Sequence, residues 1–227
     1  MESKSASTLK PLSVQEIIPL IDNTEVIFVD TRHADVFTEG YVPSSISIGL
    51  EGKLEEWSKI VLPSGKKILI IAEPDKEEES HKRLQDAGFK DFVGFLDGGF
   101  GAWLKEGREM DMIISIDADE MGMDLSFDEN IVVLDVRKNN EYEAGHIDFA
   151  VNLPLDELTD PATVSSIEEN DSLYIHCAGG YRSVIAASLL KRHGLTKLRN
   201  IKGGWKLMAQ EPGLQQKIVY PKKNSEK

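Results

Sequence analysis

The only cysteine of the 227-residue chain, Cys177, stands in a segment that suits a reactive thiolate. The apolar residues Leu173–Ile175 predict a short buried strand before it, and the apolar spacing over 183–193 predicts a helix after it, ending at Gly194. A tight loop between a strand and a helix directs backbone N–H groups towards one point, where an anion is stabilised. This setting favours the thiolate form of a cysteine. We therefore expect Cys177 to be a nucleophile, the alternative being a small buried apolar residue.

The loop itself carries residues that suit the binding of an anion. The predicted binding loop follows the nucleophile and consists of Ala178, Gly179, Gly180, Tyr181, Arg182 and Ser183. The paired glycines let the backbone turn tightly and approach a ligand. Arg182 is expected either to hold an oxyanion or to brace the loop, and Ser183 is expected to help cap it. Asp135 and Arg137 are expected to support the loop as an ion pair.

The sequence predicts neither a metal site nor a cofactor, and the histidines show why. His176 directly precedes Cys177, and side chains alternate along a strand, so its ring should point to the opposite face. We expect a buried structural histidine there rather than a general base. The five histidines show no metal-ligand spacing, so no metal site is predicted.

The pattern Cys-x-x-Gly-x-Arg-Ser after a strand resembles the active-site loop of the rhodanese family, sulfurtransferases that carry a persulfide on cysteine. Further segments match that family in order, namely Asp135–Arg137, Glu141–Ile147, Asn152–Pro154 and Gly203–Trp205. The resemblance implies transfer of sulfane sulfur from a small anionic donor, such as thiosulfate or a low-molecular-weight persulfide. The acceptor would be a thiol, a protein or cyanide, and the intermediate a persulfide on Cys177.

The chain also contains an internal repeat. Val26–Arg32 aligns with Ile131–Arg137, and Gly98–Phe100 aligns with Gly203–Trp205 at the same offset. Two copies are therefore predicted, at 1–112 and 113–227, joined near residues 108–119. Strands and helices alternate in each copy, which predicts an α/β fold of two tandem rhodanese-like domains, each with a mostly parallel central sheet flanked by helices.

The first copy is predicted to be catalytically inactive. At the position of the binding loop it has Ile71–Glu77, without cysteine, glycine or arginine. Glu73 and Asp75 would repel an anion, and Pro74 lacks an N–H donor. Segments of this copy, among them Gly94–Gly99, resemble the rhodanese pair of metallo-β-lactamase-fold/rhodanese (persulfide dioxygenase) fusions, without the metal domain.

Composition limits the class of partner. A net charge of −13 disfavours nucleic acid and anionic membrane surfaces as partners. One cysteine forms no internal disulfide, and the polar first ten residues resemble no signal peptide, so a cytoplasmic location is expected. No oligomeric state is predicted.

Two other functions fit parts of the pattern. A persulfide carrier or regulatory binding module would use the same cysteine and differ only in what accepts the sulfur. A cysteine phosphatase is less favoured, because its loop places one more residue between cysteine and arginine than the four found here, at 178–181.

Overall fold

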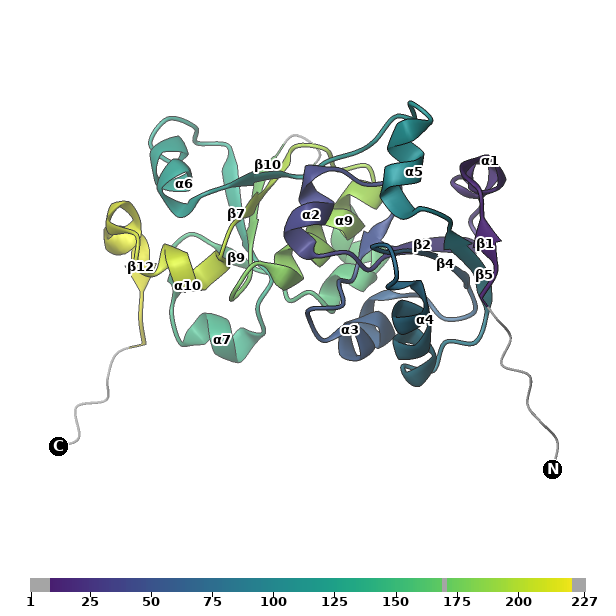
Figure 1. Cartoon of the computed structure of the whole chain (residues 1–227). Helices are drawn as coiled ribbons and strands as arrows, with labels where there is room; N and C mark the ends of the chain where they lie inside the picture. The colour runs from purple at the N-terminus through teal and green to yellow at the C-terminus, as the bar shows by residue number, and fades with distance from the viewer. Residues whose placement is uncertain (1–8, 169–170, 222–227) are drawn as a thin grey trace. The chain divides into compact units, whose positions relative to one another are not determined.

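The computed structural model describes residues 9–168 and 171–221, which fall into two compact units with the boundary between Asp111 and Met112 (Figure 1). The predicted copies meet one residue later. Within the described ranges, no helix is long and apolar enough to cross a membrane.

The first unit alternates strands and helices, where η marks a 3₁₀ helix. In chain order they are β1 (Pro11–Leu12), α1 (Val14–Ile17), η1 (Ile18–Leu20), β2 (Val26–Asp30), α2 (Ala34–Glu39), β3 (Ile46–Ser47), α3 (Leu54–Val61), β4 (Lys67–Ile71), α4 (Glu77–Asp86), β5 (Phe92–Leu96) and α5 (Gly99–Lys105).

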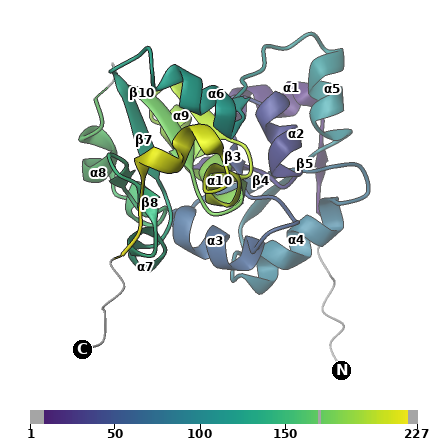
Figure 2. The same ribbon diagram turned by 90° about the vertical axis from the view of Figure 1, so that its left-hand side faces the viewer.

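These strands form one parallel sheet in the order β1-β5-β4-β2-β3. The interior strand β2 is buried along its whole length, which is typical of parallel sheets covered on both faces. Helices α1, α2 and α5 cover one face, and α3 and α4 cover the other (Figures 1 and 2).

The second unit repeats this arrangement and extends it at its C-terminal end. Its elements are β6 (Ile114–Ile116), α6 (Ala118–Asp124), β7 (Ile131–Asp135), α7 (Asn139–Glu143), β8 (His146–Ile147), β9 (Val151–Asn152), η2 (Glu157–Thr159), α8 (Pro161–Ser165), β10 (Ser172–His176), α9 (Tyr181–Arg192), β11 (Leu198–Ile201), α10 (Gly204–Met208), η3 (Pro212–Lys217) and β12 (Ile218–Val219).

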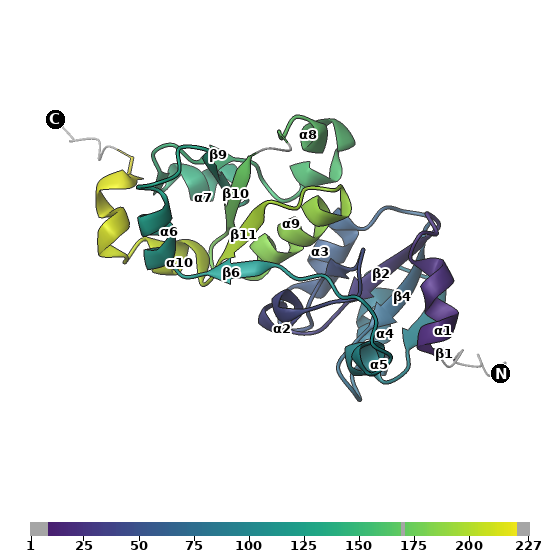
Figure 3. The same cartoon turned by 90° about the horizontal axis from the view of Figure 1, so that it is seen from above.

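The second sheet has the order β6-β11-β10-β7-β9 and is also parallel throughout, while β8 and β12 form a separate antiparallel pair. Each strand of the first sheet has its counterpart at the same position of the second. Helix α9 packs along β10 and β11 (Figure 3). The opposite face of the sheet holds an apolar core that includes Met121 of α6 and Met208 of α10. The predicted fold of two parallel α/β domains is confirmed.

The predicted linker contains regular structure. Strand β6 and the start of α6 both lie inside residues 108–119. The apolar segment at 112–116 therefore supplies an edge strand of the second sheet.

Candidate active site

Cys177 directly follows β10, the central strand of the second sheet. The next helix, α9, begins at Tyr181, so the loop between strand and helix consists only of 177–180. The prediction that the helix begins at Ser183 is wrong by two residues. Tyr181 and Arg182 are polar or amphipathic, and the apolar period that reveals a helix starts only after them. Arg182 and Ser183 consequently belong to the first helical turn, and their side chains are fixed by the helix.

The strand order places this loop where the connections of the sheet change direction. From β7 the chain runs to the edge strand β9 and then returns to β10 on the other side of β7. Connections that leave in opposite directions open a gap beyond the carboxyl ends of the two strands, where α/β proteins bind ligands. Asp135 ends β7 and Cys177 follows β10, so both lie at this point.

The thiol of Cys177 is enclosed by polar groups of its own loop. Its residue is 1% exposed, and the backbone N–H of Gly180 donates to Sγ at 3.2 Å. Sγ lies 3.7 Å from Ser183 Oγ, within reach of a hydrogen bond to sulfur. In that contact the thiol is the donor, so the group that the site offers to a negative sulfur is the backbone N–H of Gly180, at the N-terminus of a helix twelve residues long.

Ser183 is in turn held by Asn200 on the neighbouring strand β11. Its Oγ donates to Asn200 Oδ1 at 2.7 Å or to Gly180 O at 2.9 Å, and Asn200 Nδ2 donates to Ser115 Oγ at 3.2 Å. Ser183 and Asn200 are both buried. Sequence reasoning missed Asn200, because nothing within its own segment distinguishes it from other strand residues.

The two loop glycines differ in what they contribute. Gly180 has φ of 104°, in the left-handed region that favours glycine, and forms the N-cap of α9. Gly179 lies outside that region and is exposed, with open space around its Cα. The tight turn expected of the pair therefore depends on Gly180.

The Gly-Gly-Trp segment closes the loop from the other side. The N–H of Trp205 donates to Cys177 O at 2.7 Å, and that of Lys206 donates to Ala178 O at 3.1 Å. Gly204 has φ of 53°, and a Cβ there would lie 2.3 Å from Cys177 O. Glycine at 204 is thus required for the start of α10 to reach the nucleophile's backbone.

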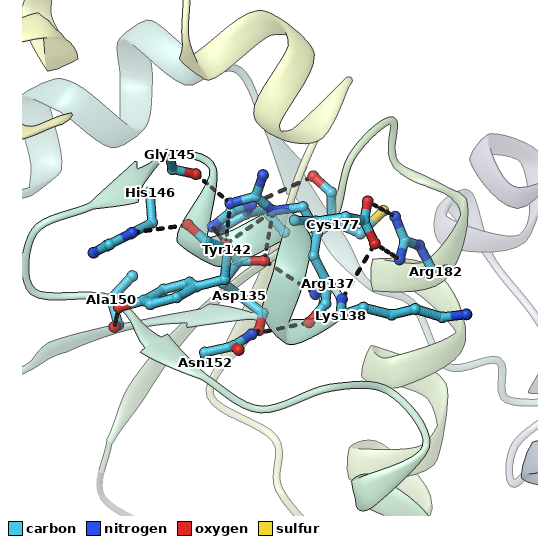
Figure 4. Close-up of polar contacts among 12 residues, drawn as sticks. Asp135, Arg137, Lys138, Tyr142, Gly145, His146, Ala150, Asn152, Cys177 and Arg182 are labelled. Atoms are coloured by element: carbon cyan, nitrogen blue, oxygen red, sulfur yellow. Dashed lines mark hydrogen bonds and ion pairs between the residues drawn. The ribbon is translucent and has the colours of Figure 1, made fainter. Parts of the chain in front are cut away.

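Arg182 is paired with an acidic residue of α7 (Figure 4). Its Nη1 and Nη2 donate to the two carboxylate oxygens of Glu141 at 2.7 and 2.8 Å. The Lys138 N–H also donates to Glu141 Oε2 at 3.2 Å. The hydrogen bond from Arg182 lowers the pKa of Glu141, and the same bond raises the pKa of Arg182. Of the two expected roles for Arg182, the geometry matches that of a brace.

Asp135 and Arg137 form the expected ion pair, fully buried in the second unit. The Arg137 guanidinium donates to Asp135 through Nε and Nη2, and Nη2 also donates to Gly145 O at 2.8 Å. It stacks over the Trp205 ring at 4.5 Å from the centroid. Asn152 Nδ2 donates to the carbonyls of both Asp135 and Arg137, each at 2.9 Å. The pair joins three segments around the loop.

His176 is buried with no exposed surface, on the face of the sheet that carries Asp135. Its Nε2 lies 3.6 Å from Asp135 Oδ2 and has no hydrogen-bond partner among the described residues. Burial lowers the pKa of His176, so the ring is neutral at physiological pH. The position agrees with the expectation of a buried histidine facing away from the thiol.

The first unit keeps the same brace without a nucleophile. Arg32 donates to Asp30 through Nε and Nη2, and to Gly40 O at 2.9 Å, while stacking over Phe100 at 4.4 Å. Because this arrangement persists where no thiol exists, we assign the Asp–Arg pair to the scaffold of both units.

The start of the degenerate loop also keeps its backbone packing. Ile71 pairs with Asp30 as His176 pairs with Asp135, so Ala72 follows β4 where Cys177 follows β10, and the alignment that set Ile71 opposite Cys177 is wrong by one residue. A Cβ at Gly99 would lie 2.6 Å from Ala72 O, just as a Cβ at Gly204 would crowd Cys177 O. Within the residues that the structure covers, no group of three or more His, Cys, Asp and Glu is placed to hold a metal ion.

The fold, the repeated brace and the cysteine loop together define a pair of rhodanese-like domains. The family model described as "Rhodanese-like domain" matches residues 13–106 and 120–211, so the chain belongs to the rhodanese family.

Among curated relatives, the putative sulfur carrier protein YrkF of Bacillus subtilis (strain 168) is 40% identical over 91 residues, which are 40% of this chain and 47% of that protein. The uncharacterized protein YqhL of the same organism is 39% identical over 74 residues, 33% of this chain and 57% of that protein. The chain thus spans about half the length of these relatives.

The chain is also similar to parts of solved structures. The rhodanese-like domain of the Alr3790 protein from Anabaena sp is 29% identical with a TM-score of 0.43, covering 48% of this chain and 81% of that one. Thiosulfate sulfurtransferase from Pseudomonas aeruginosa is 20% identical with a TM-score of 0.41, covering 87% of this chain and 41% of that one.

Proposed function

We propose that the protein is a sulfurtransferase whose second domain carries sulfane sulfur as a persulfide on Cys177. One observation carries the proposal: the Cys177 Sγ lies at the N-terminus of α9 and accepts the N–H of Gly180 at 3.2 Å. A persulfide extends the same negative sulfur by one atom, and donors already in place stabilise it without reorganisation.

The reaction proceeds in two displacements. The Cys177 thiolate attacks the outer sulfur of a donor, forming an S–S bond while the bond from that sulfur to the rest of the donor breaks. With thiosulfate the leaving group is sulfite, and the enzyme retains Cys–S–S⁻. A thiol acceptor, or cyanide in the assay, then attacks the terminal sulfur and restores the thiolate. Such covalent catalysis predicts ping-pong kinetics.

The first domain has a structural or partner-binding role in this proposal. It holds Ala72 in place of the nucleophile and acidic residues in place of the cradle. The narrower likeness to the rhodanese pair of persulfide dioxygenase fusions rests on sequence segments of this domain. A cytoplasmic site of action follows from the single cysteine, which suits a reducing compartment.

A second candidate is a persulfide carrier that hands its sulfur to a partner protein. The name of YrkF, a putative sulfur carrier protein, favours it. Transferase and carrier form the same Cys177 persulfide and differ in the acceptor. Isolation of a partner joined to the protein by a Cys177-dependent mixed disulfide would favour the carrier.

The test is thiocyanate formation from thiosulfate and cyanide by wild type and by Cys177→Ser. We expect activity in the wild type and none in the variant, because serine lacks the nucleophilic thiolate. Intact-mass measurement after donor treatment should show one added sulfur atom only when Cys177 is present. Equal activity in both proteins would overturn the mechanism. A Cys177 persulfide without thiocyanate formation would direct the proposal to a carrier.

A further inference from the structure

We infer that Glu141 determines which sulfur donor the site prefers. Because Glu141 forms an ion pair with Arg182 and neutralises its charge, the site prefers organic persulfides, R–S–SH, to dianionic thiosulfate. The inference rests on the proposed function and adds to it a substrate class and a residue that determines it.

The pairing of Glu141 with Arg182 is close and doubly hydrogen-bonded. Arg182 Nη1 donates to Glu141 Oε2 at 2.7 Å and Nη2 donates to Oε1 at 2.8 Å, a bidentate geometry that fixes an arginine firmly. The Arg182 side chain is only 14% exposed, and the Glu141 side chain 32%. Glu141 is itself held by the Lys138 N–H at the start of α7. Arg182 is therefore held away from a donor's oxyanion.

The guanidinium of Arg182 lies close enough to Cys177 for its charge to affect the nucleophile. Arg182 lies in the first turn of α9, next to Ser183, whose Oγ is 3.7 Å from the Cys177 sulfur. Cys177 and Arg182 lie beside each other in Figure 4, and the charge of Cys177 is, after the hydrogen bond to Glu141, a further cause of the raised pKa of Arg182. A guanidinium released from Glu141 would attract a second anion at the same place.

Pairing with Glu141 neutralises the positive charge of Arg182. Among the described residues around the loop, no second arginine replaces that charge. Arg137, the other arginine beside the loop, donates to Asp135 and is 3% exposed. The Lys138 side chain is exposed and extends away from Cys177 in Figure 4. The residues of 178–181 carry no cation. The positive field at the sulfur comes from the backbone N–H of Gly180 and from the helix N-terminus.

The two donors bring different charges to this site. Thiosulfate is a dianion that meets a thiolate, and it leaves as the sulfite dianion with Cys–S–S⁻ behind. A protonated persulfide is neutral at its reacting end: the thiolate attacks the terminal sulfur, Cys–S–SH forms, and RS⁻ departs. Like charges at short range repel unless a cation offsets them, so a neutralised Arg182 disfavours thiosulfate selectively.

The experiment compares donors in wild type, Glu141→Gln and Glu143→Gln. Glu143 lies on the same helix and is exposed, so its variant makes the same change of charge away from Arg182. For each protein, kcat/KM is measured with thiosulfate and with a small persulfide whose alkyl group carries no charge, at a pH low enough to keep its S–SH group protonated. We expect the thiosulfate-to-persulfide ratio to rise about tenfold in Glu141→Gln, a change of ~1.4 kcal/mol, and to stay at the wild-type value in Glu143→Gln.

Taking a ratio within one protein removes any common loss from misfolding or a displaced loop. Glu141→Asp keeps the carboxylate and should stay closer to the wild-type ratio than Glu141→Gln does. An unchanged or lower ratio in Glu141→Gln, with Cys177-dependent transfer intact, overturns this inference alone. Absence of transfer from both donors in the wild type overturns the proposed function and the inference with it.

Discussion

Replacing Gly180 with alanine tests whether the turn at the N-terminus of α9 positions the site. At φ of 104°, any side chain is strained, although the nearest atom to a Cβ there would be Gly203 N at 3.6 Å. The cost is thus conformational rather than steric. Left-handed backbone costs an L-residue about 1–2 kcal/mol, which we expect as the loss in free energy of unfolding.

The strained residue is also the one whose N–H donates to the Cys177 sulfur, at 3.2 Å. Relaxation of φ turns that N–H away, so the thiolate and the persulfide lose a donor. Removal of one preorganised donor of this kind lowers turnover by about 10²-fold in other enzymes, and we expect at least a tenfold loss here. Thiocyanate formation measures the turnover, and alkylation of Cys177 by iodoacetamide measures thiolate reactivity without a sulfur donor.

Gly179→Ala is the matched control, one residue away in the same loop. Gly179 lies outside the left-handed region, and a Cβ at this position would meet open space within 4 Å. We expect wild-type stability in urea and wild-type turnover. Equal effects of the two substitutions, or a Gly180→Ala protein with normal turnover, would refute the reasoning.

Two further predictions concern buried polar groups of the second domain. Burial lowers the pKa of His176, so below about pH 6.5 the unfolded chain binds a proton that the folded state excludes. The free energy of unfolding should therefore decrease as the pH is lowered, by up to ~1.4 kcal/mol for each pH unit. Urea unfolding at several pH values should show a shallower loss for His176→Gln, and parallel curves would contradict the prediction. Ser183→Ala leaves Asn200 Oδ1 without the donor that it has at 2.7 Å, and should cost about 1–3 kcal/mol, measured by urea unfolding. If that substitution costs the same in an Asn200→Ala background, the two residues are not coupled.

Much of the fold follows from local sequence, because parallel strands such as 131–135 are continuous apolar runs that end at a polar residue. The internal repeat can be predicted because both copies contain such a run, at 26–30 and at 131–135. The position of Cys177 at a strand end also follows from its own segment.

Partners distant in sequence could not be predicted in this way. The pairing of Arg182 with Glu141 joins residues 41 positions apart, and that of Ser183 with Asn200 joins two different elements. Glu141 lies within a segment that resembles a family motif, so its presence was visible, but its contact depends on how α7 packs beside α9. The start of α9 was missed because its first turn lacks apolar spacing.

The duplicated brace bears on how natural variants should be interpreted. Arg32 and Arg137 make the same bonds in two domains, only one of which has a thiol. Substitutions at either arginine should therefore reduce the amount of folded protein in a cell, while the turnover of each surviving molecule stays near normal. A survey that records only total activity would group such changes with those at Cys177, although they arise from different defects. Activity normalised to soluble protein separates the two.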